Sequence, residues 1–160
     1  MSELASPLRL NLEYVPLDAL RNYDRNARTN SPSQIAKLID AISTFGFLVP
    51  VLISATNDVI AGHARIAAAR QLQMAEVPAV SVEHLNDAET RALRILDNRI
   101  AELASWDNDL LAFEFGELLE LDLKHDFFAL SLTGFDFAEI DQLISADANA
   151  HGSDDVAPEP

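Results

Sequence analysis

The chain has 160 residues, enough for one domain or for a small domain with an appendage. It contains no cysteine, which excludes disulfides, zinc–thiolate sites and thiol nucleophiles. Its formal net charge of −15, from 11 basic and 26 acidic residues, excludes a uniformly basic DNA-binding surface. No apolar run reaches the roughly 20 residues of a membrane span, and the N-terminus lacks a signal-peptide core, so we expect a cytoplasmic protein with no membrane partner.

The charge is distributed unevenly along the chain. Residues 1–78 carry seven basic and seven acidic residues, whereas residues 79–160 carry four basic and nineteen acidic ones. We therefore expect any anionic ligand in the first half. The second half should repel a nucleic-acid backbone unless it meets a basic partner.

Strand-like and helix-like patterns alternate at first, which predicts an α/β core over residues 8–85. The expected elements are a half-buried strand over 8–14 with Leu8, Leu10 and Leu12 on one side, a helical turn at 17–20, a polar loop at 22–30, a helix from Ser31 to Gly46, a hairpin of strands 49–53 and 59–61, a helix over 64–72 and a strand over 76–82. Ser31, Pro32 and Gln34 supply the capping signal of the first helix. The strand, glycine turn, helix and strand over 59–82 resemble a crossover unit.

Residues 86–144 show helical patterns alone and predict a helical C-terminal part. A helix capped by Asn86 should run to about Ala104, with an apolar stripe made of Ala92, Leu93, Leu96, Ile100 and Leu103. Asp107 caps the next helix, and a short last helix should end near Ile144. Small, acidic and proline-bearing residues then predict a disordered tail or linker over 145–160. This half shows no separate helix-turn-helix signature.

The sharpest chemical feature is the run from Ala61 to Arg65, Ala-Gly-His-Ala-Arg, in which a strand passes through glycine directly into a helix. Unpaired N–H groups and the dipole at a helix N-terminus favour an anion there. A cation at Arg65 opposes the dipole unless an anion binds between them. Two interpretations stay open, a phosphate-binding turn and a plain turn with a solvated arginine. His63 is equally open: it is a general acid–base, a phosphate donor or a helix start without chemistry.

Two other polar groups are candidates for the same chemistry. Asp97 and Asn98, with Glu102, present oxygen ligands of the kind that Mg²⁺ prefers. Their periodicity alone favours a solvated helix face in which Arg99 is paired within the helix. The loop from Arg25 to Arg28 suits an anion or a nucleotide, or is a flexible surface loop.

In this order the features resemble the ParB/sulfiredoxin-like superfamily, specifically the ParB N-terminal domain, also called the ParB-like nuclease domain, from about Leu8 to Leu121. The motifs that carry the resemblance are Asn26-Ala27-Arg28, Gly46-Phe47 with Val49-Pro50-Val51, Ile60-Ala61-Gly62-His63-Ala64-Arg65, Glu76-Val77-Pro78 and Leu96-Asp97-Asn98-Arg99. The resemblance implies an α/β fold, a small mixed sheet with flanking helices, followed by a helical part. In ParB proteins the third motif holds the triphosphate of CTP, and the last helps to hold magnesium.

The chain departs from the ParB pattern at the arginine box, Gly-Glu-Arg-Arg-x-Arg-Ala, where His63, Ala64 and Ala67 replace the glutamate and two arginines. One arginine, Arg65, implies weaker or altered triphosphate binding. Sulfiredoxin has cysteine at the position of His63, so sulfinic-acid reduction is excluded. The likeness is strongest to ParB-like domains of phages and prophages that precede DNA methyltransferases. These domains share Gly-His-x-Arg, Asp-Asn-Arg, Trp-Asp and Thr-Gly-Phe motifs.

The resemblance therefore implies a nucleotide-binding module that acts in DNA modification, as the front domain of a DNA methyltransferase or its partner, or in DNA partitioning. The expected partners are DNA or a DNA methyltransferase, with a second copy as a possible homodimer, and the expected cofactor is CTP or ATP with Mg²⁺. The implied phosphate contacts are Gly62, His63, Ala64, Arg65, Asn26 and Arg28, and the implied magnesium ligands, facing that turn, are Asp97 and Asn98. If the protein is an enzyme, a nuclease, NTPase or free-amino-acid kinase of the same fold, His63 and Asp97 are its catalytic candidates. A degenerate fold without a ligand is the remaining alternative.

Overall fold

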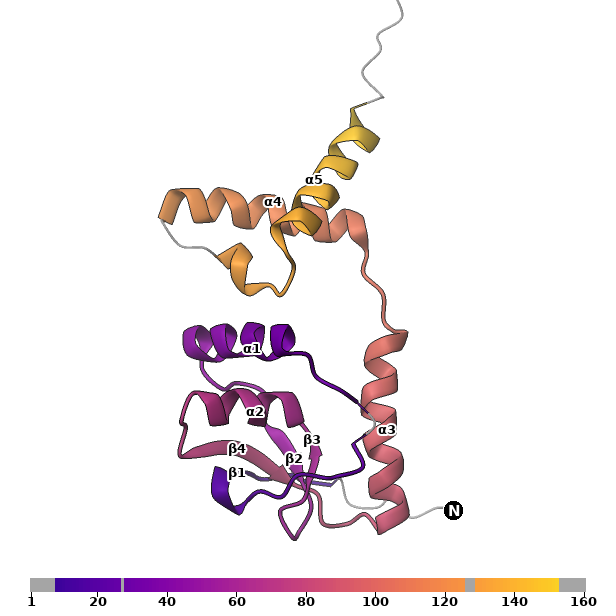
Figure 1. Ribbon diagram of the computed structural model, residues 1–160. Coiled ribbons are helices and arrows are strands. Elements are labelled where there is room, and N and C mark those ends of the chain that lie inside the picture. The colour runs from indigo at the N-terminus through magenta and orange to yellow at the C-terminus, as the bar shows by residue number, and fades with distance from the viewer. Residues whose placement is uncertain (1–7, 27, 126–128, 153–160) are drawn as a thin grey trace, which may run out of the picture. The chain divides into compact units, whose positions relative to one another are not determined.

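A computed structural model describes residues 8–26, 28–125 and 129–152 of the chain (Figure 1). They form two compact units, which divide between Leu103 and Ala104. The first unit contains a four-stranded sheet with helices, and the second is helical. This confirms the predicted fold class, an α/β core followed by a helical part. Within the described ranges, no helix combines the length and apolar character needed to cross a membrane.

The sheet is mixed, and its strand order is β1 (Leu12–Pro16), β4 (Glu76–Ser81), β2 (Val51–Ile53) and β3 (Val59–Ala61). β4 pairs antiparallel with β1 and parallel with β2, while β2 and β3 form the predicted hairpin. The prediction that residues 59–82 form a crossover unit between parallel strands is wrong. β2 lies between β3 and β4, and β3 and β4 run in opposite directions. The parallel pair is β2 with β4.

Helix α2 (His63–Gln71) lies against the sheet, and α1 (Pro32–Phe45) packs on α2 (Figure 1). The alanine-rich sequence of α2 allows this close approach, because Ala68 and Ala69 are fully buried. Ser31 caps α1 as predicted, since its Oγ accepts a hydrogen bond of 3.1 Å from the backbone N–H of Gln34. The core consists of buried residues from the strands, from the 3-10 helix η1 (Leu17–Ala19) and the residue after it, and from α2. They are Val15, Leu17, Leu20, Val51, Ile53, Val59, Ile66, Ala69, Val77 and Ala79.

The half-buried strand predicted over 8–14 differs from the structure. β1 begins at Leu12, and Leu8, Leu10 and Leu12 are all more than half exposed. β1 is an edge strand whose one buried residue, Val15, belongs to the core under α2. Because side chains alternate along a strand, Leu12 points to the opposite face of the sheet. The alternation of apolar and polar residues predicts which side of the strand is apolar, but not whether another element covers that side.

Helix α3 (Asp87–Leu103) belongs to the first unit, so the predicted boundary at residue 85 is too early. Asn86 caps it through two reciprocal hydrogen bonds with Glu89, of 2.8 and 2.9 Å. The buried residue of α3 is Arg94, which is 8% exposed and donates a hydrogen bond to β3. Four of the five residues of the predicted apolar stripe are instead exposed: Ala92, Leu96, Ile100 and Leu103.

The second unit contains α4 (Asn108–His125), the 3-10 helix η2 (Ala129–Leu132) and α5 (Phe137–His151). Its core contains Phe115, Leu130 and Ile140, and buried Asp122 accepts hydrogen bonds from the N–H groups that start η2. Phe135 contacts Phe115 and Trp106 edge to face, with ring centroids 5.3 and 5.5 Å apart.

Helix α5 corrects the predicted end of the ordered chain. It continues to His151 instead of ending near Ile144, so residues 145–151 are helical and not a disordered tail. Three alanines in this stretch have high helix propensity, and His151 pairs with Asp147 one turn earlier at 3.2 Å. The rest of the predicted tail, 153–160, lies outside the described residues.

Candidate functional site

The turn between β3 and α2 requires glycine. Gly62 caps α2 with φ +104° and ψ 21°, a left-handed conformation that side chains rarely adopt. A Cβ at this position would lie 2.6 Å from Cγ1 of Val51, which is fully buried. β3 therefore passes into α2 through one residue, and the first N–H groups of the helix follow it directly.

A cavity of about 250 Å³ lies at this turn and is lined from four parts of the first unit. The loop before α1 contributes Asn26, Arg28 and Asn30, α1 contributes Gln34 and Leu38, the turn contributes residues 60–65, and α3 contributes Asp97 and Asn98. The structure thus brings together all of the predicted site residues: Asn26, Arg28, Gly62, His63, Ala64, Arg65, Asp97 and Asn98. Ala27, in the same motif as Asn26 and Arg28, lies outside the described residues.

Arg65 is held at the cavity with unused hydrogen-bonding capacity. Its Nη2 donates a hydrogen bond of 3.2 Å to the carbonyl of Pro50, while its Nε is buried and without a partner. Burial lowers the pKa of Arg65, and the charge of Asp97 opposes that shift. A guanidinium stays protonated in proteins, so Arg65 carries its charge into the cavity.

His63 occupies the first position of α2, and its Nε2 is also buried without a hydrogen-bond partner. Burial lowers the pKa of His63, and the positive charge of Arg94 lowers it further. His63 is therefore neutral at pH 7 and its ring can donate or accept one proton. Two unpartnered nitrogens, one on His63 and one on Arg65, thus lie at the N-terminal turn of α2.

Asn98 links the loop before α1 to helix α3. Its Oδ1 accepts a hydrogen bond of 3.3 Å from Nη1 of Arg28, and its Nδ2 donates one of 3.0 Å to the carbonyl of Arg94. Arg99 pairs within α3 with Glu102 at 2.9 Å, as expected for a solvated helix face. Asp97 is the one carboxylate among the described residues that line the cavity. No group of three His, Asp or Glu suited to a metal is found in the described part of the chain.

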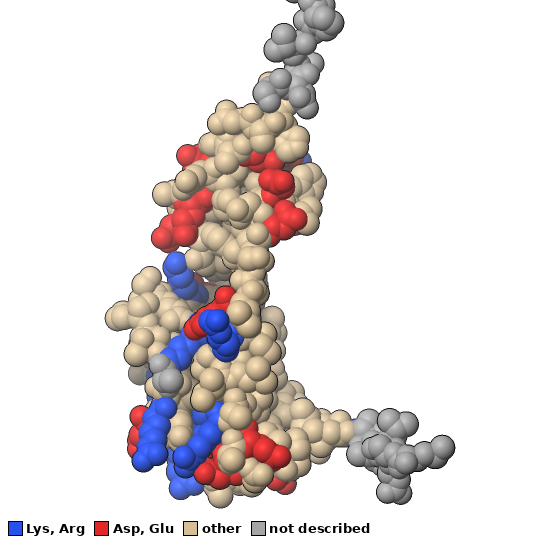
Figure 2. Space-filling view, turned by 90° about the vertical axis from the view of Figure 1, so that its right-hand side faces the viewer, with Lys and Arg blue, Asp and Glu red and all other residues tan. Residues whose placement is uncertain are grey.

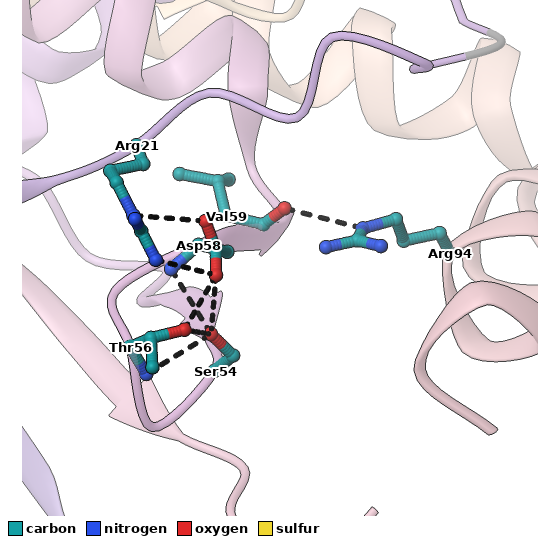
Figure 3. A network of polar contacts seen from close by, with 6 residues as sticks. All are labelled: Arg21, Ser54, Thr56, Asp58, Val59 and Arg94. Carbon is teal, nitrogen blue, oxygen red and sulfur yellow. Dashed lines mark hydrogen bonds and ion pairs between the residues drawn. The ribbon is translucent and has the colours of Figure 1, made fainter. Parts of the chain in front are cut away.

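Arg94 is a structural residue of the site that the sequence patterns did not reveal. Its Nε donates a hydrogen bond of 3.3 Å to the carbonyl of Val59 on β3 (Figure 3). Its guanidinium also lies 3.7 Å from the centre of the Tyr23 ring, a cation–π contact. Because β3 leads into the Gly62 turn, this contact positions α3, and with it Asp97 and Asn98, beside the turn.

A second network fixes the turn that leads into the same, N-terminal end of β3, away from Gly62 (Figure 3). Asp58 accepts hydrogen bonds from Thr56 at 2.6 Å and Ser54 at 3.3 Å and pairs with Arg21 at 3.1 Å. The hydrogen bond from Thr56 is the largest cause that lowers the pKa of Asp58, and Arg21 adds to it. These contacts close the β2–β3 turn and hold β3 in register, so they support the site without lining it.

Comparison with known proteins identifies the family. Residues 5–99 match the ParB N-terminal domain, so the chain belongs to that family, and residues 109–160 match the ParB-methyltransferase HTH domain. The expectation that the second half lacks a helix-turn-helix signature is therefore wrong. Among the described residues, η2 lies between α4 and α5 in the chain, and this unit lacks the basic residues that mark a recognition helix.

Individual proteins agree with this assignment. The chain is 42% identical over 81 residues to the ParB-like nuclease domain-containing protein YnaK of Escherichia coli (strain K12), which covers 51% of this chain and 93% of that protein. It is 33% identical over 92 residues to the nucleoid occlusion protein of Lysinibacillus sphaericus (strain C3-41), covering 55% of this chain but 30% of that protein.

A solved structure shares the fold. It is the C-terminally truncated chromosome-partitioning protein ParB from Caulobacter crescentus, complexed with CTP-γ-S. The TM-score is 0.67 at 19% identity, over 89% of each chain.

Proposed function

We propose that this chain is a cytoplasmic nucleotide-binding module of the ParB type, in which the Gly62 turn binds the phosphates of a nucleoside triphosphate. The observation that carries the proposal is the pair of unpartnered buried nitrogens on His63 and Arg65 at the start of α2. Phosphate oxygens bound in the cavity would offer these two side chains the hydrogen-bond acceptors they lack and would meet the positive end of the helix dipole. The CTP-γ-S complex of the Caulobacter crescentus protein supports the same ligand class.

Arg28 and Asn26 provide further polar contacts for the nucleotide from the loop before α1. Asp97, with Asn98 beside it, would hold a magnesium ion. A single carboxylate fits Mg²⁺ when phosphate oxygens and water complete the shell, which is the usual arrangement in nucleotide sites. The ion would supply charge neutralisation for the triphosphate. The family resemblance makes CTP and ATP the two candidate nucleotides.

We assign the module to DNA modification, as the front domain or partner of a DNA methyltransferase, or to DNA partitioning. The match of residues 109–160 to the ParB-methyltransferase HTH domain supports the first role. The matches to a nucleoid occlusion protein and to a chromosome-partitioning fold support the second.

An enzymatic function is the second candidate, and the neutral His63 ring in the cavity favours it. Nuclease, NTPase or kinase chemistry needs a positioned base and a metal centre. His63 and Asp97 are the residues that would serve, but one carboxylate provides little of a catalytic metal site. The binding module is therefore the better supported function.

Calorimetric titration of the full chain with CTP, ATP, GTP and UTP, each with excess Mg²⁺, tests both functions. The module requires saturable binding of at least one nucleotide in the millimolar range or tighter, weakened when EDTA replaces Mg²⁺. Chromatography of the same samples after incubation reveals hydrolysis or phosphoryl transfer, which only the enzyme requires. Absence of binding by all four nucleotides at millimolar concentration would overturn the proposal.

A further inference from the structure

The second unit matches a helix-turn-helix domain but lacks the charge that DNA binding needs. Over residues 104–125 and 129–152 it contains ten Asp and Glu residues and a single Lys or Arg, Lys124. Lys124 lies 4.0 Å from Glu120, and helix α5 contains neither Lys nor Arg. In Figure 2 the second unit is marked by red side chains, whereas the blue ones gather on the first unit. Because cations that neutralise phosphates supply most of the affinity for DNA, the charge of this unit disfavours DNA binding.

One face of α4 is apolar and exposed. Leu110 is 64% exposed, Phe113 61% and Leu121 48%. At about 100° per residue these three positions lie within one third of the helix circumference. Glu114 and Glu117 fall among the apolar side chains on this arc, and so does Lys124, whose charge is paired with Glu120. Two carboxylates therefore face one paired lysine on this side of the helix. The buried side of α4 is a different one, and Phe115 there packs with α5 and η2.

We propose that this α4 face, formed by Leu110, Phe113, Leu121, Glu114 and Glu117, is a docking surface for a basic amphipathic helix of another protein. Such a helix presents apolar anchors for Leu110 and Phe113 and lysines or arginines for the two glutamates, the usual pattern of helix-in-groove recognition. Charge selects this occupant. The same face of a second copy, a DNA duplex and an anionic membrane all carry negative charge and are repelled by the second unit, whereas a basic segment is attracted to it.

Fluorescence anisotropy with the full chain and a labelled helical peptide of Leu and Lys tests the proposal at physiological salt. The wild type should bind this peptide and should not bind the matched peptide of Leu and Glu or a labelled DNA duplex. The double variant Leu110→Ser with Phe113→Ser should lose affinity on the order of tenfold or more, because central apolar anchors dominate interfaces of this kind. Glu114→Gln with Glu117→Gln should bind more weakly and with less dependence on salt.

Leu123→Ser is the matched control. Leu123 is 79% exposed on the same helix but lies about 140° around it from Leu110. This variant should keep the wild-type affinity within about twofold. The proposal is overturned if the wild type does not bind the Leu–Lys peptide, if Leu123→Ser weakens binding as much as the double variant, or if the duplex binds more tightly than the peptide. Since the proposal concerns the second unit alone, none of these results depends on nucleotide binding by the first.

Discussion

Gly62 is the position at which substitution by alanine should be most destabilising among the described glycines with a positive φ. The variant Gly62→Ala tests this. The backbone there has φ +104°, and holding a residue with a side chain in such a region costs about 1–3 kcal/mol. The new Cβ would also lie 2.6 Å from Cγ1 and 3.1 Å from Cβ of Val51, a fully buried residue that cannot move into solvent. Overpacking a core of this kind costs about 1–3 kcal/mol more. The combined loss should be about 2–6 kcal/mol.

Substitutions at two other glycines distinguish the cost of backbone strain from the cost of the steric clash with Val51. Gly134 has φ +86° but nothing within 4 Å of an added Cβ, so Gly134→Ala should cost about 1–2 kcal/mol from strain alone. Gly116 lies inside α4 with nothing within 4 Å, so Gly116→Ala should stabilise the chain by roughly 0.5–1 kcal/mol. Urea denaturation followed by far-UV circular dichroism measures all three variants. If Gly62→Ala costs no more than Gly134→Ala, the close approach of the turn to Val51 does not constrain the site.

Three further predictions concern the arginines and the histidine. Arg65→Ala should weaken nucleotide binding tenfold to a hundredfold in calorimetry, because one charge-assisted contact contributes about 1.5–3 kcal/mol; the exposed control Arg99→Ala should change it less than about twofold. Because burial lowers the pKa of His63 below its ordinary 6.5, the folded chain binds fewer protons than the unfolded one. The free energy of unfolding should therefore fall as pH drops through 6.5 towards the folded pKa, and His63→Ala should remove this dependence in urea titrations at several pH values. Bound phosphates favour the protonated ring, so nucleotide affinity should rise as the pH falls through the same range. A nucleotide affinity that does not change with pH would refute a phosphate contact by His63. Arg94→Ala should cost about 2–4 kcal/mol of stability through the lost carbonyl bond and the stack on Tyr23, and Arg94→Lys should not restore it; a neutral result would show that Arg94 does not hold α3.

The elements predicted well are those with local signals. Ser31 and Asn86 each satisfy N–H groups of the helix that follows them, and Gly62 sits where a strand must turn into a helix at once. Such signals depend on neighbours three or four positions away, so a sequence displays them. The motifs of the candidate site could be found in the same way, although nothing local shows that Asp97 lies at the cavity of Gly62.

The features that were missed depend on distant residues. Arg94 is buried because the carbonyl of Val59 and the ring of Tyr23 satisfy its charge, and both lie far away in the sequence. Leu12 and Leu96 belong to apolar patterns that predict a buried face, but the core of the first unit forms on the other side of each element. The helix-turn-helix unit lacked the basic residues by which such domains are usually recognised.

The central claim, that phosphates bind at the Gly62 turn, is tested most directly by NMR titration of the ¹⁵N-labelled chain with the nucleotide that binds in calorimetry. We predict that the largest and saturable amide shifts occur at Gly62, His63, Ala64 and Arg65, with smaller ones at Arg28, Asp97 and Asn98. Inorganic sulfate at equal ionic strength provides the control for non-specific anion effects. Saturable shifts confined to other parts of the chain, with the Gly62 turn unchanged, would contradict the account.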